Sequence, residues 1–371
     1  MKIVFIGGRD IQSLGGIESY MYNLSLELIK LGHIPVVYCE SNKNYEENIR
    51  GIKVIYLKGT KNNIICKPWC SLKATIRTIF KERDVDLIHY NTWPPSLWSF
   101  IPNLFGIKTL MQGHGFEWKH TKYNRFQVKI LKIMEGVTAH TNKHLIMCSE
   151  EQTRFFKEKY HVDATTIPTA VHLPKSDIVE EERCKIIKAF GLTQKKYFLF
   201  LGRLSKEKNI DFLIKAFNLV ETDDFKLAIA GSNTREIEFV QYLKSLKIDD
   251  KVLFLGNVSG KDKDVLLDCA YCFCLPSSTE GLSIALLEAI SYKLPIIASN
   301  IEANKEACGD NAIYVEPENT EALAKAINDT INTPQIFDGF TQKNYDNIKE
   351  HYTWDKVAKK YVSFLYSLGI K

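Results

Sequence analysis

Proline and glycine are too scarce in this sequence for a low-complexity or linker protein, at 11 and 20 of 371 residues. Apolar residues make up 45% and charged residues 25%, which is ordinary globular composition and excludes a disordered, collagenous or coiled-coil protein. The chain is too long for one ordinary core and has the length of two domains of roughly 100–200 residues each. The sequence therefore indicates a globular protein with two domains.

Secretory and membrane-spanning segments are lacking as well. The N-terminal run MKIVFIGG is too short for a secretory core and predicts a strand. Residues 90–107 carry no charge over 18 residues, the lower limit for a spanning helix. Pro94, Pro95 and Pro102 interrupt this run and would break the helical ladder. We therefore expect an apolar loop or a membrane-facing surface there, and no transmembrane helix.

The sequence also lacks metal-binding spacings and a disulfide framework. The nine cysteines are odd in number, and in a chain of this length they indicate a reducing cytoplasm. Neither Cys66 and Cys70 nor the cluster at 269–274 has a histidine at zinc-finger spacing. The run DCAYCFCLP around that cluster predicts a buried strand. We expect no metal ion, and a cytoplasmic protein.

The positive charge is concentrated in the first half. Residues 1–175 hold 24 basic and 15 acidic residues, whereas residues 176–371 hold 25 and 29. The segment KHTKYNRFQVKILK (119–132) combines cations with aromatic residues. It fits a solvated helix face, an anionic membrane surface or a diphosphate-bearing substrate. No recognised nucleic-acid motif accompanies the charge, so we expect no nucleic acid as a partner.

Strand and helix patterns alternate along both halves and predict two doubly wound parallel-sheet domains. The expected domains are residues 1–172 and 173–350, followed by an amphipathic C-terminal helix in 351–371. In such folds ligands lie at the carboxyl ends of the strands, and we expect them in the cleft between the domains. The predicted strands are 2–8, 35–40, 85–91, 108–115 and 144–149 in the first half, and 197–202, 225–231, 251–256, 272–276 and 295–299 in the second.

Cations follow the first strand of the second half. Arg203 and Lys208 come directly after the buried run ending at Gly202. Arg203 can grip a phosphate with two parallel hydrogen bonds, and Lys208 adds a point charge. The alternative is that both are surface cations that flank a helix start. On these residues alone, the surface alternative is the stronger one.

A loop and helix start follow a later strand, in FCLPSSTEGLSIALLEAISYKLPIIAS (273–299). We expect a helix to begin near Leu282, and its free amides suit a diphosphate. Glu280 can accept hydrogen bonds from sugar hydroxyls and Glu288 from ribose hydroxyls, although capping and an exposed helix position are the respective alternatives. The amides expected to face the diphosphate are those of Gly281, Leu282 and Ser283.

These residues together resemble the family 4 glycosyltransferases, which are retaining enzymes of the GT-B architecture. The likeness covers nearly the whole chain and is strongest in the E-x7-E motif, Glu280 to Glu288, with GRLSKEKN (202–209) upstream. GGIESYMYNLSLELIKLGH (15–33) resembles the family's glycine loop and first helix, and WDKVAKKYVSFL its final helix, which crosses back to the first domain. HGFEWKHTKYNRF (114–126) is similar to the branch that builds bacterial surface polysaccharides.

The resemblance implies a role for each matching residue. Arg203 and Lys208 would bind the donor diphosphate, Glu288 the ribose and Glu280 the donor sugar. Gly15 and Gly16 would let the N-terminal loop approach the phosphate and acceptor closely. His114 would contact the sugar near the reacting carbon, where a structural histidine is the alternative. Glu117 and Trp118 would border the acceptor site, although Trp118 fits packing under a loop equally well.

The resemblance further implies a retaining transfer of a hexose or N-acetylhexosamine from a nucleotide-diphosphate sugar, a UDP-sugar above all. The acceptor would be a saccharide, lipid-linked through a polyprenyl diphosphate, in O-antigen, capsule or exopolysaccharide synthesis at the inner face of the cytoplasmic membrane. No cofactor and no essential divalent metal are expected. A nucleotide-sugar epimerase of GT-B architecture and a non-catalytic saccharide-binding protein remain alternatives. A dinucleotide oxidoreductase is weaker, because no G-x-G-x-x-G follows a strand.

Overall fold

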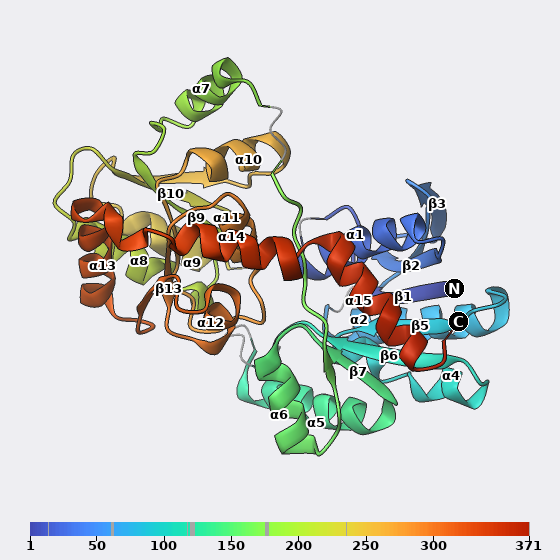
Figure 1. The fold of residues 1–371 in the computed structure, drawn as a ribbon. Coiled ribbons are helices and arrows are strands. Elements are labelled where there is room, and N and C mark those ends of the chain that lie inside the picture. Colours follow the sequence, from blue (N-terminus) through green and yellow to red (C-terminus); the bar gives the residue numbers. More distant parts are fainter. Residues whose placement is uncertain are drawn as a thin grey trace. The chain divides into compact units, whose positions relative to one another are not determined.

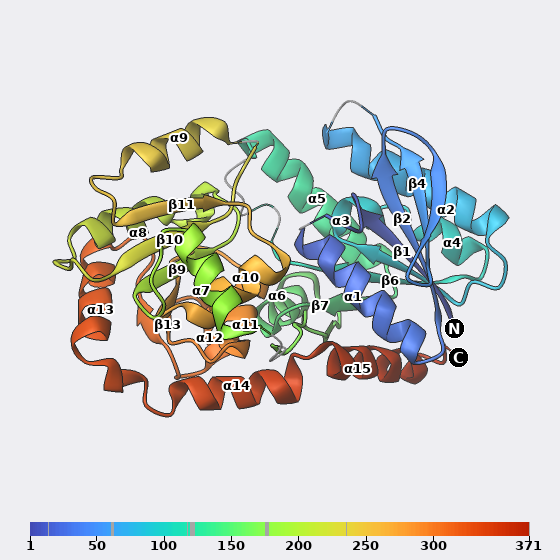
Figure 2. The same ribbon diagram turned by 90° about the horizontal axis from the view of Figure 1, so that it is seen from above.

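The computed structural model describes residues 1–13, 15–60, 63–116, 118, 123–174, 178–234 and 236–370. The chain folds into two compact units, which are drawn in Figures 1 and 2. Unit 1 consists of Met1–Ala170 and Trp354–Lys371, and unit 2 of Val171–Thr353. Each unit has its own sheet with helices packed on it, so the predicted fold class of two doubly wound domains is confirmed.

The sheet of unit 1 has eight strands in the order β3-β4-β2-β1-β5-β6-β7-β8. Its neighbouring strands are parallel except for β3 and β4, which form an antiparallel pair. The central strands are buried on both faces, which explains continuous apolar runs such as IVFI in β1. The strands are β1 (Lys2–Gly8), β2 (Ile34–Ser41), β3 (Tyr45–Ile49), β4 (Ile52–Lys58), β5 (Leu87–Asn91), β6 (Lys108–Gly113), β7 (His144–Met147) and β8 (Thr165–Thr166).

The helices of unit 1 cover this sheet, and two short ones lie in the uncharged stretch at residues 90–107. Residues 90–107 contain the end of β5 followed by two short helices where an apolar loop was expected, and neither helix exceeds five residues. In the parts of the chain that the structure describes, no helix has both the length and the apolar character needed to cross a bilayer. The helices are α1 (Gly16–Lys30), α2 (Asn63–Lys81), α3 (Trp93–Ser96), α4 (Phe100–Leu104), α5 (Arg125–Thr141), α6 (Glu150–Tyr160) and α15 (Trp354–Ser367).

The C-terminal helix α15 completes the core of unit 1. Its apolar residues recur at helical spacing and pack with the buried face of α1. Both views show α15 running beside α1, with the two chain ends close together (Figures 1 and 2). The Tyr361 hydroxyl lies 2.9 Å from Nδ1 of His89 on β5, and the Trp354 ring makes an edge contact with Tyr20 of α1. The prediction of an amphipathic C-terminal helix within 351–371 is confirmed.

The sheet of unit 2 has six strands, all parallel, in the order β11-β10-β9-β12-β13-β14. The predicted strands of the second half are all present, and β14 is an additional edge strand. Cys272 and Cys274 are buried in the predicted core strand, whereas Cys269 is buried at the end of the preceding helix, and all three are free thiols. The strands are β9 (Tyr197–Leu201), β10 (Lys226–Ala230), β11 (Val252–Gly256), β12 (Cys272–Leu275), β13 (Ile296–Ser299) and β14 (Ile313–Val315).

The helices of unit 2 connect these strands in the doubly wound manner. Helix α11 has the most apolar sequence among them, because most of its residues are buried, including Leu286, Leu287 and Ile290. The α-helices are α7 (Glu180–Ala189), α8 (Ile210–Asn218), α9 (Ile237–Ser245), α10 (Gly260–Cys269), α11 (Ile284–Ser291), α12 (Glu302–Cys308), α13 (Thr320–Asn332) and α14 (Phe340–His351), and the 3-10 turns are η2 (Lys206–Lys208) and η3 (Pro334–Phe337).

Candidate functional site

The strand order of unit 2 reverses between β9 and β12. From β9 the chain winds first toward β10 and β11, and later toward β12, β13 and β14. In open α/β sheets a ligand binds outside the carboxyl ends of the strands at this point of reversal. The loops that leave β9 and β12 are residues 202–209 and 276–283. They contain most of the residues predicted to bind a donor.

Hydrogen bonds to backbone carbonyls hold these two loops against each other. Asn209 adopts a left-handed conformation at φ 52°, and its Nδ2 donates to the Pro276 carbonyl at 3.0 Å. The Ser278 amide donates to the Glu207 carbonyl at 2.9 Å. The β9 loop is therefore anchored on the β12 loop by groups that do not depend on the predicted ligand-binding side chains.

A close backbone approach fixes the start of the β9 loop. Gly231, at the end of β10, has φ 147°, and a Cβ there would lie 1.8 Å from the carbonyl oxygen of Gly202. A side chain at position 231 would displace the Gly202 backbone, which leads directly into Arg203. Gly231 thus fixes the backbone position from which Arg203 follows.

Lys208 and Glu280 are brought together by this arrangement, although 72 residues separate them. Lys208 Nζ lies 2.5 Å from Glu280 Oε1, and the two side chains are only 16% and 8% exposed. Arg203, in the same loop, is exposed. Among the described residues it forms no ion pair, so its guanidinium is available to an anion. The predicted cations therefore share one loop, but one of them is neutralised by the predicted sugar-binding acid.

The helix after β12 begins two residues later than the predicted start near Leu282. Helix α11 starts at Ile284, and Ser283 is its N-cap, with Oγ accepting from the Leu286 amide at 3.4 Å. A helix start leaves its first amides without intrahelical partners, and here those belong to Ile284 and Ala285. Gly281 and Leu282 lie in the preceding loop. The prediction placed the helical amides too early because Ser283 caps the helix instead of belonging to it.

Glu288 lies in the second turn of α11 and is also paired with a lysine. Its Oε1 is 2.5 Å from Nζ of Lys263, on α10. The Glu288 side chain remains 22% exposed, so it is accessible to a ligand. Both acids of the E-x7-E motif thus carry a lysine partner in this structure, which orients each carboxylate.

Unit 1 has its own point of strand reversal, between β1 and β5. Gly7 lies at the end of β1 with φ 122°, and a Cβ there would lie 2.6 Å from the Asn91 carbonyl oxygen. Only glycine allows this approach. His114 follows the neighbouring strand β6, and its Nε2 lies 2.9 Å from Asn91 Oδ1. The structure therefore places His114 at the carboxyl edge of the sheet, against the end of β5.

Asn91 determines which nitrogen of His114 carries the proton. Asn91 Nδ2 donates to the Ile6 carbonyl at 3.3 Å, so its Oδ1 is the atom that faces His114. This oxygen can only accept a hydrogen bond, and His114 Nε2 must therefore be protonated. Burial lowers the pKa of His114 to about 3. The ring is neutral at physiological pH, and Nδ1 holds a free lone pair that can accept a hydrogen bond from a hydroxyl.

Two buried histidines predict that unit 1 loses stability in acid. Burial lowers the pKa of His89 and of His114 to about 3, against about 6.5 in an unfolded chain. Below pH 6.5 the unfolded state binds more protons, so the stabilisation is complete above that pH and is lost as the pH falls toward 3. We expect a loss of roughly 2 kcal/mol for each histidine between pH 7.5 and 5. Urea denaturation followed by tryptophan fluorescence measures it.

All five tryptophans belong to unit 1, so fluorescence reports on that unit alone. His89→Gln and His114→Gln should each remove one histidine's share of the pH dependence. The control is His140→Gln, since His140 is exposed. An unfolding free energy that stays constant from pH 7.5 to 5 in the natural sequence would contradict the assignment.

The N-terminal glycines lie at the start of α1. Gly15 is the N-cap of this helix and Gly16 its first residue. The Glu18 carboxylate occupies the space beside Gly15, where a Cβ would lie 2.0 Å from Oε2. Its Oε1 accepts from the Arg9 amide at 3.0 Å. In this structure the loop is thus held by a carboxylate at the position where the prediction expects phosphate and acceptor.

Trp118 is packed against α5 and α6. Its Nε1 donates to Glu135 Oε2 at 2.8 Å, the ammonium group of Lys132 lies 4.4 Å from its ring centre, and its ring tilts against Phe155. These contacts fit the packing alternative for Trp118. Glu117, the other residue predicted at the acceptor site, lies outside the described residues.

Sequence reasoning did not identify Asn91, Lys263 or Glu18. Asn91 is the last residue of a predicted strand. A polar residue at the carboxyl end of a buried strand is a signal that could have identified it. Lys263 and Glu18 gave no such signal, because their roles depend on contacts across elements. Within the described ranges, His, Cys, Asp and Glu side chains form no group of three or more that could hold a metal ion.

Two family models match the chain. The model "Glycosyltransferase Family 4" matches residues 14–174, and the model "Glycosyl transferases group 1" matches residues 182–350. The first match lies in unit 1 and extends four residues into unit 2, and the second lies wholly in unit 2. The two matches together span most of the sequence and meet close to the division between the units.

Individual relatives agree with these models, and a solved structure shares the fold. An uncharacterised glycosyltransferase of Haemophilus influenzae is 23% identical, with 98% of this chain and 100% of the relative aligned. The O-antigen chain mannosyltransferase RfbU of Salmonella typhimurium is 28% identical over 56% of this chain and 58% of its own. The structure of Anabaena HepE in complex with UDP and glucose has a TM-score of 0.81 at 16% identity, covering 99% of this chain and 100% of HepE.

Proposed function

Because the chain is a glycosyltransferase of the GT-B type, we propose that it transfers a hexose or an N-acetylhexosamine from a nucleotide-diphosphate sugar to a saccharide acceptor. The observation that carries the proposal is the position of Arg203 and Lys208. Both lie in the loop after β9, at the point of strand reversal of unit 2. Ligands of such sheets bind at this edge, and two cations there suit a diphosphate.

The chemistry of transfer explains the residue types in these loops. Cleavage of the sugar–nucleotide bond develops negative charge on the diphosphate and positive charge on the sugar. Groups preorganised against this charge lower the barrier. In the proposed complex Arg203 and Lys208 stabilise the departing diphosphate together with the first amides of α11. We expect no metal ion to be required, because these groups supply the positive charge.

The Lys208–Glu280 pair gives the proposal a specific rearrangement. In the proposed complex Lys208 contacts the diphosphate and Glu280 accepts hydrogen bonds from hydroxyls of the donor sugar. Their mutual contact at 2.5 Å therefore opens or is shared when donor binds. Glu288 accepts from the ribose hydroxyls in the same way, beside Lys263.

The donor is proposed to be a UDP-sugar, and the stereochemical outcome retention. UDP is the nucleotide bound in the structure of HepE, whose fold this chain shares. We propose attack from the same face as the departing diphosphate, with a phosphate oxygen helping to remove the acceptor proton. His114 is proposed to contact the donor sugar through the Nδ1 lone pair. No side chain of this chain is assigned as a covalent nucleophile.

The acceptor is proposed to be a growing saccharide on a polyprenyl diphosphate, in O-antigen, capsule or exopolysaccharide synthesis. RfbU, which aligns with more than half of this chain, is an O-antigen chain mannosyltransferase. Unit 1 carries the glycines at the start of α1 and the segment around Trp118 and Glu117, to which we assign acceptor contacts. The protein would then work at the inner face of the cytoplasmic membrane.

Transfer is tested by separating it from chemistry on the donor alone. The purified protein is first screened for thermal stabilisation by UDP-, GDP- and dTDP-sugars, because a tight ligand raises the melting temperature. We expect a UDP-sugar to give the largest shift. The selected donor is then incubated with and without a lipid-linked saccharide, in the presence of a chelator. The expected product is an elongated saccharide that forms only with acceptor.

Other outcomes would contradict the proposal. A changed sugar or nucleotide sugar released without acceptor would identify an epimerase. Binding of saccharide without turnover of any donor would identify a binding protein. Complete loss of transfer on chelation, restored by a divalent ion, would overturn metal independence while leaving the transfer itself in place.

A further inference from the structure

Helix α5 exposes a continuous apolar stripe. Phe126 is 71% exposed, Ile130 38%, Ile133 58% and Val137 45%. Spacings of four, three and four residues place these side chains along one line of the helix. The opposite face packs into unit 1 through Leu131, Glu135 and Thr138. The stripe is therefore a second apolar face on a helix that already has a buried one. A contiguous exposed apolar surface of this kind indicates an interaction site.

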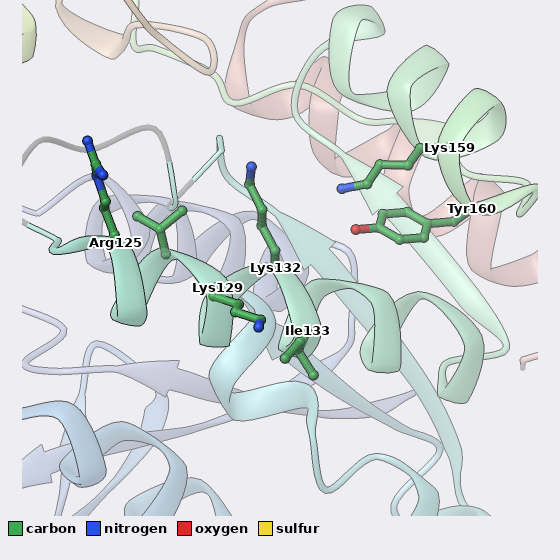
Figure 3. Close-up of a pocket in the computed structure, with 7 residues that line it drawn as sticks. Arg125, Lys129, Lys132, Ile133, Lys159 and Tyr160 are labelled. Carbon is green, nitrogen blue, oxygen red and sulfur yellow. The ribbon is translucent and has the colours of Figure 1, made fainter.

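Cations lie beside this stripe. Arg125, Lys129 and Lys132 are exposed on α5, and Figure 3 shows Arg125 and Lys132 projecting to the same side of the helix, with Lys159 reaching toward them from α6. Together with neighbouring groups they line an open hollow of about 540 Å³. The hollow can accept an anionic group as large as a lipid phosphate.

The positive charge of this face is not neutralised. In the described ranges, Arg125, Lys129 and Lys132 form no ion pair. The only acid of α5 is Glu135, which is buried and accepts hydrogen bonds from Lys159, Tyr160 and Trp118. The exposed face of α5 thus combines uncompensated cations with large apolar side chains, the composition of helices that lie in a membrane interface.

We propose that α5 docks on an anionic phospholipid bilayer. The apolar stripe of Phe126, Ile130, Ile133 and Val137 enters the boundary between headgroups and acyl chains, and Arg125, Lys129 and Lys132 bind lipid phosphates beside it. This goes beyond sugar transfer, because it assigns a membrane surface to residues that hold neither donor nor acceptor. It can be tested without any nucleotide sugar.

A second exposed apolar patch lies elsewhere on unit 1. It consists of Phe80 at the end of α2 with Phe100, Leu104 and Phe105 in and after α4, and the Phe80 and Phe105 rings make an edge contact. Helix α4 itself, FIPNL, carries no cation. Of the α2 cations near Phe80, Arg77 pairs with Glu46 and Lys73 donates to the Lys58 carbonyl, which leaves Lys81 beside the patch against three cations on α5. Charge complementarity to anionic lipid therefore favours α5, and the Phe80 patch supplies the comparison in the experiment.

The experiment measures co-sedimentation of the full chain with vesicles. One set contains phosphatidylcholine alone, and the other adds phosphatidylglycerol. We expect binding to the anionic vesicles only, falling as salt is raised because exposed charges are screened. Each cation near an anionic surface strengthens binding by roughly fivefold. Arg125→Glu/Lys129→Glu/Lys132→Glu should therefore weaken the partition by about a hundredfold or more, and Phe126→Ser/Ile133→Ser should weaken it as well.

Matched variants control for net charge and general hydrophobicity. Lys356→Glu/Lys359→Glu/Lys360→Glu makes the same change in charge on exposed positions of α15, and Phe80→Ser/Leu104→Ser removes the other patch. Both should bind vesicles as the natural sequence does. Absence of binding at low salt, or an equal loss in either control, would overturn the assignment to α5. Transfer to a soluble saccharide by Phe126→Ser/Ile133→Ser should be unchanged, so failure of docking and failure of transfer are distinguishable.

Discussion

Alanine at Arg203 is expected to lower kcat/KM for the nucleotide-sugar donor by about 10²–10³-fold, the usual cost of removing one preorganised donor from a developing negative charge. The guanidinium is exposed and unpaired among the described residues, so the free energy of unfolding should stay within about 0.5 kcal/mol. Initial rates over a range of donor concentrations, with urea denaturation alongside, measure both quantities. A loss in rate without a loss in stability isolates the phosphate contact.

Variants of Lys208, measured in the same way, distinguish a loss of phosphate binding from a loss of stability. Lys208→Ala should reduce transfer to a similar extent, but it also leaves the Glu280 carboxylate, 8% exposed, without its partner. An unpaired buried charge costs about 3 kcal/mol. Lys208→Ala/Glu280→Ala removes that charge and should recover most of the stability while transfer stays at its lowest. Recovery of stability without recovery of rate is the expected signature.

Lys206→Ala is the matched control for Arg203, because Lys206 is an exposed cation in the same loop. It should retain near-normal transfer. If Arg203→Ala behaves like Lys206→Ala, Arg203 has no role at the diphosphate. If Lys208→Ala/Glu280→Ala regains transfer along with stability, the pair is structural.

Aspartate at Asn91 is expected to make transfer depend on pH. A carboxylate beside His114 Nε2 favours the imidazolium and raises the pKa of His114 from about 3 toward or above its ordinary value. Once charged, the ring has no lone pair on Nδ1 to accept a sugar hydroxyl. Transfer by Asn91→Asp should then be roughly tenfold or more lower at pH 6 than at pH 8.5. A pH–rate profile of kcat measures it.

Asn91 is a positioning residue, and its controls test for that role. Asn91→Ala should lower kcat without a new inflection in the pH profile, because no charge is introduced. In a His114→Ala background, Asn91→Asp should have no further effect on the profile. An inflection that persists without His114 would show that another group titrates, and a flat profile for Asn91→Asp would remove the proposed link between the two residues.

The sequence was sufficient for the fold because parallel strands buried on both faces form continuous apolar runs. YFLFL in β9 and IIAS in β13 could be read directly. The hairpin of β3 and β4 was missed, since β3 has the sequence YEENI and is almost entirely exposed. Strand β14, only three residues long at a sheet edge, gave too short a pattern to predict.

The candidate site was predictable in its residue types but not in its pairings. Arg203, Lys208 and the Glu280–Glu288 spacing can be recognised along the chain. The contacts of Lys208 with Glu280 and of Lys263 with Glu288 cross between elements, so no local pattern encodes them. The start of α11 was placed too early because Ser283 is as plausible a first helical residue as an N-cap until its Oγ is located.

The divided composition of unit 1 determines the order in which the chain can fold as it leaves the ribosome. Unit 2, from Val171 to Thr353, is a single segment and is complete before Trp354 is translated. Synthesis of unit 1 begins first, but its core is completed last. Tyr20 and His89 gain their contacts with Trp354 and Tyr361 only after helix α15 has been translated. A premature stop just before Trp354 would therefore leave unit 2 complete, whereas the core of unit 1 would lack helix α15.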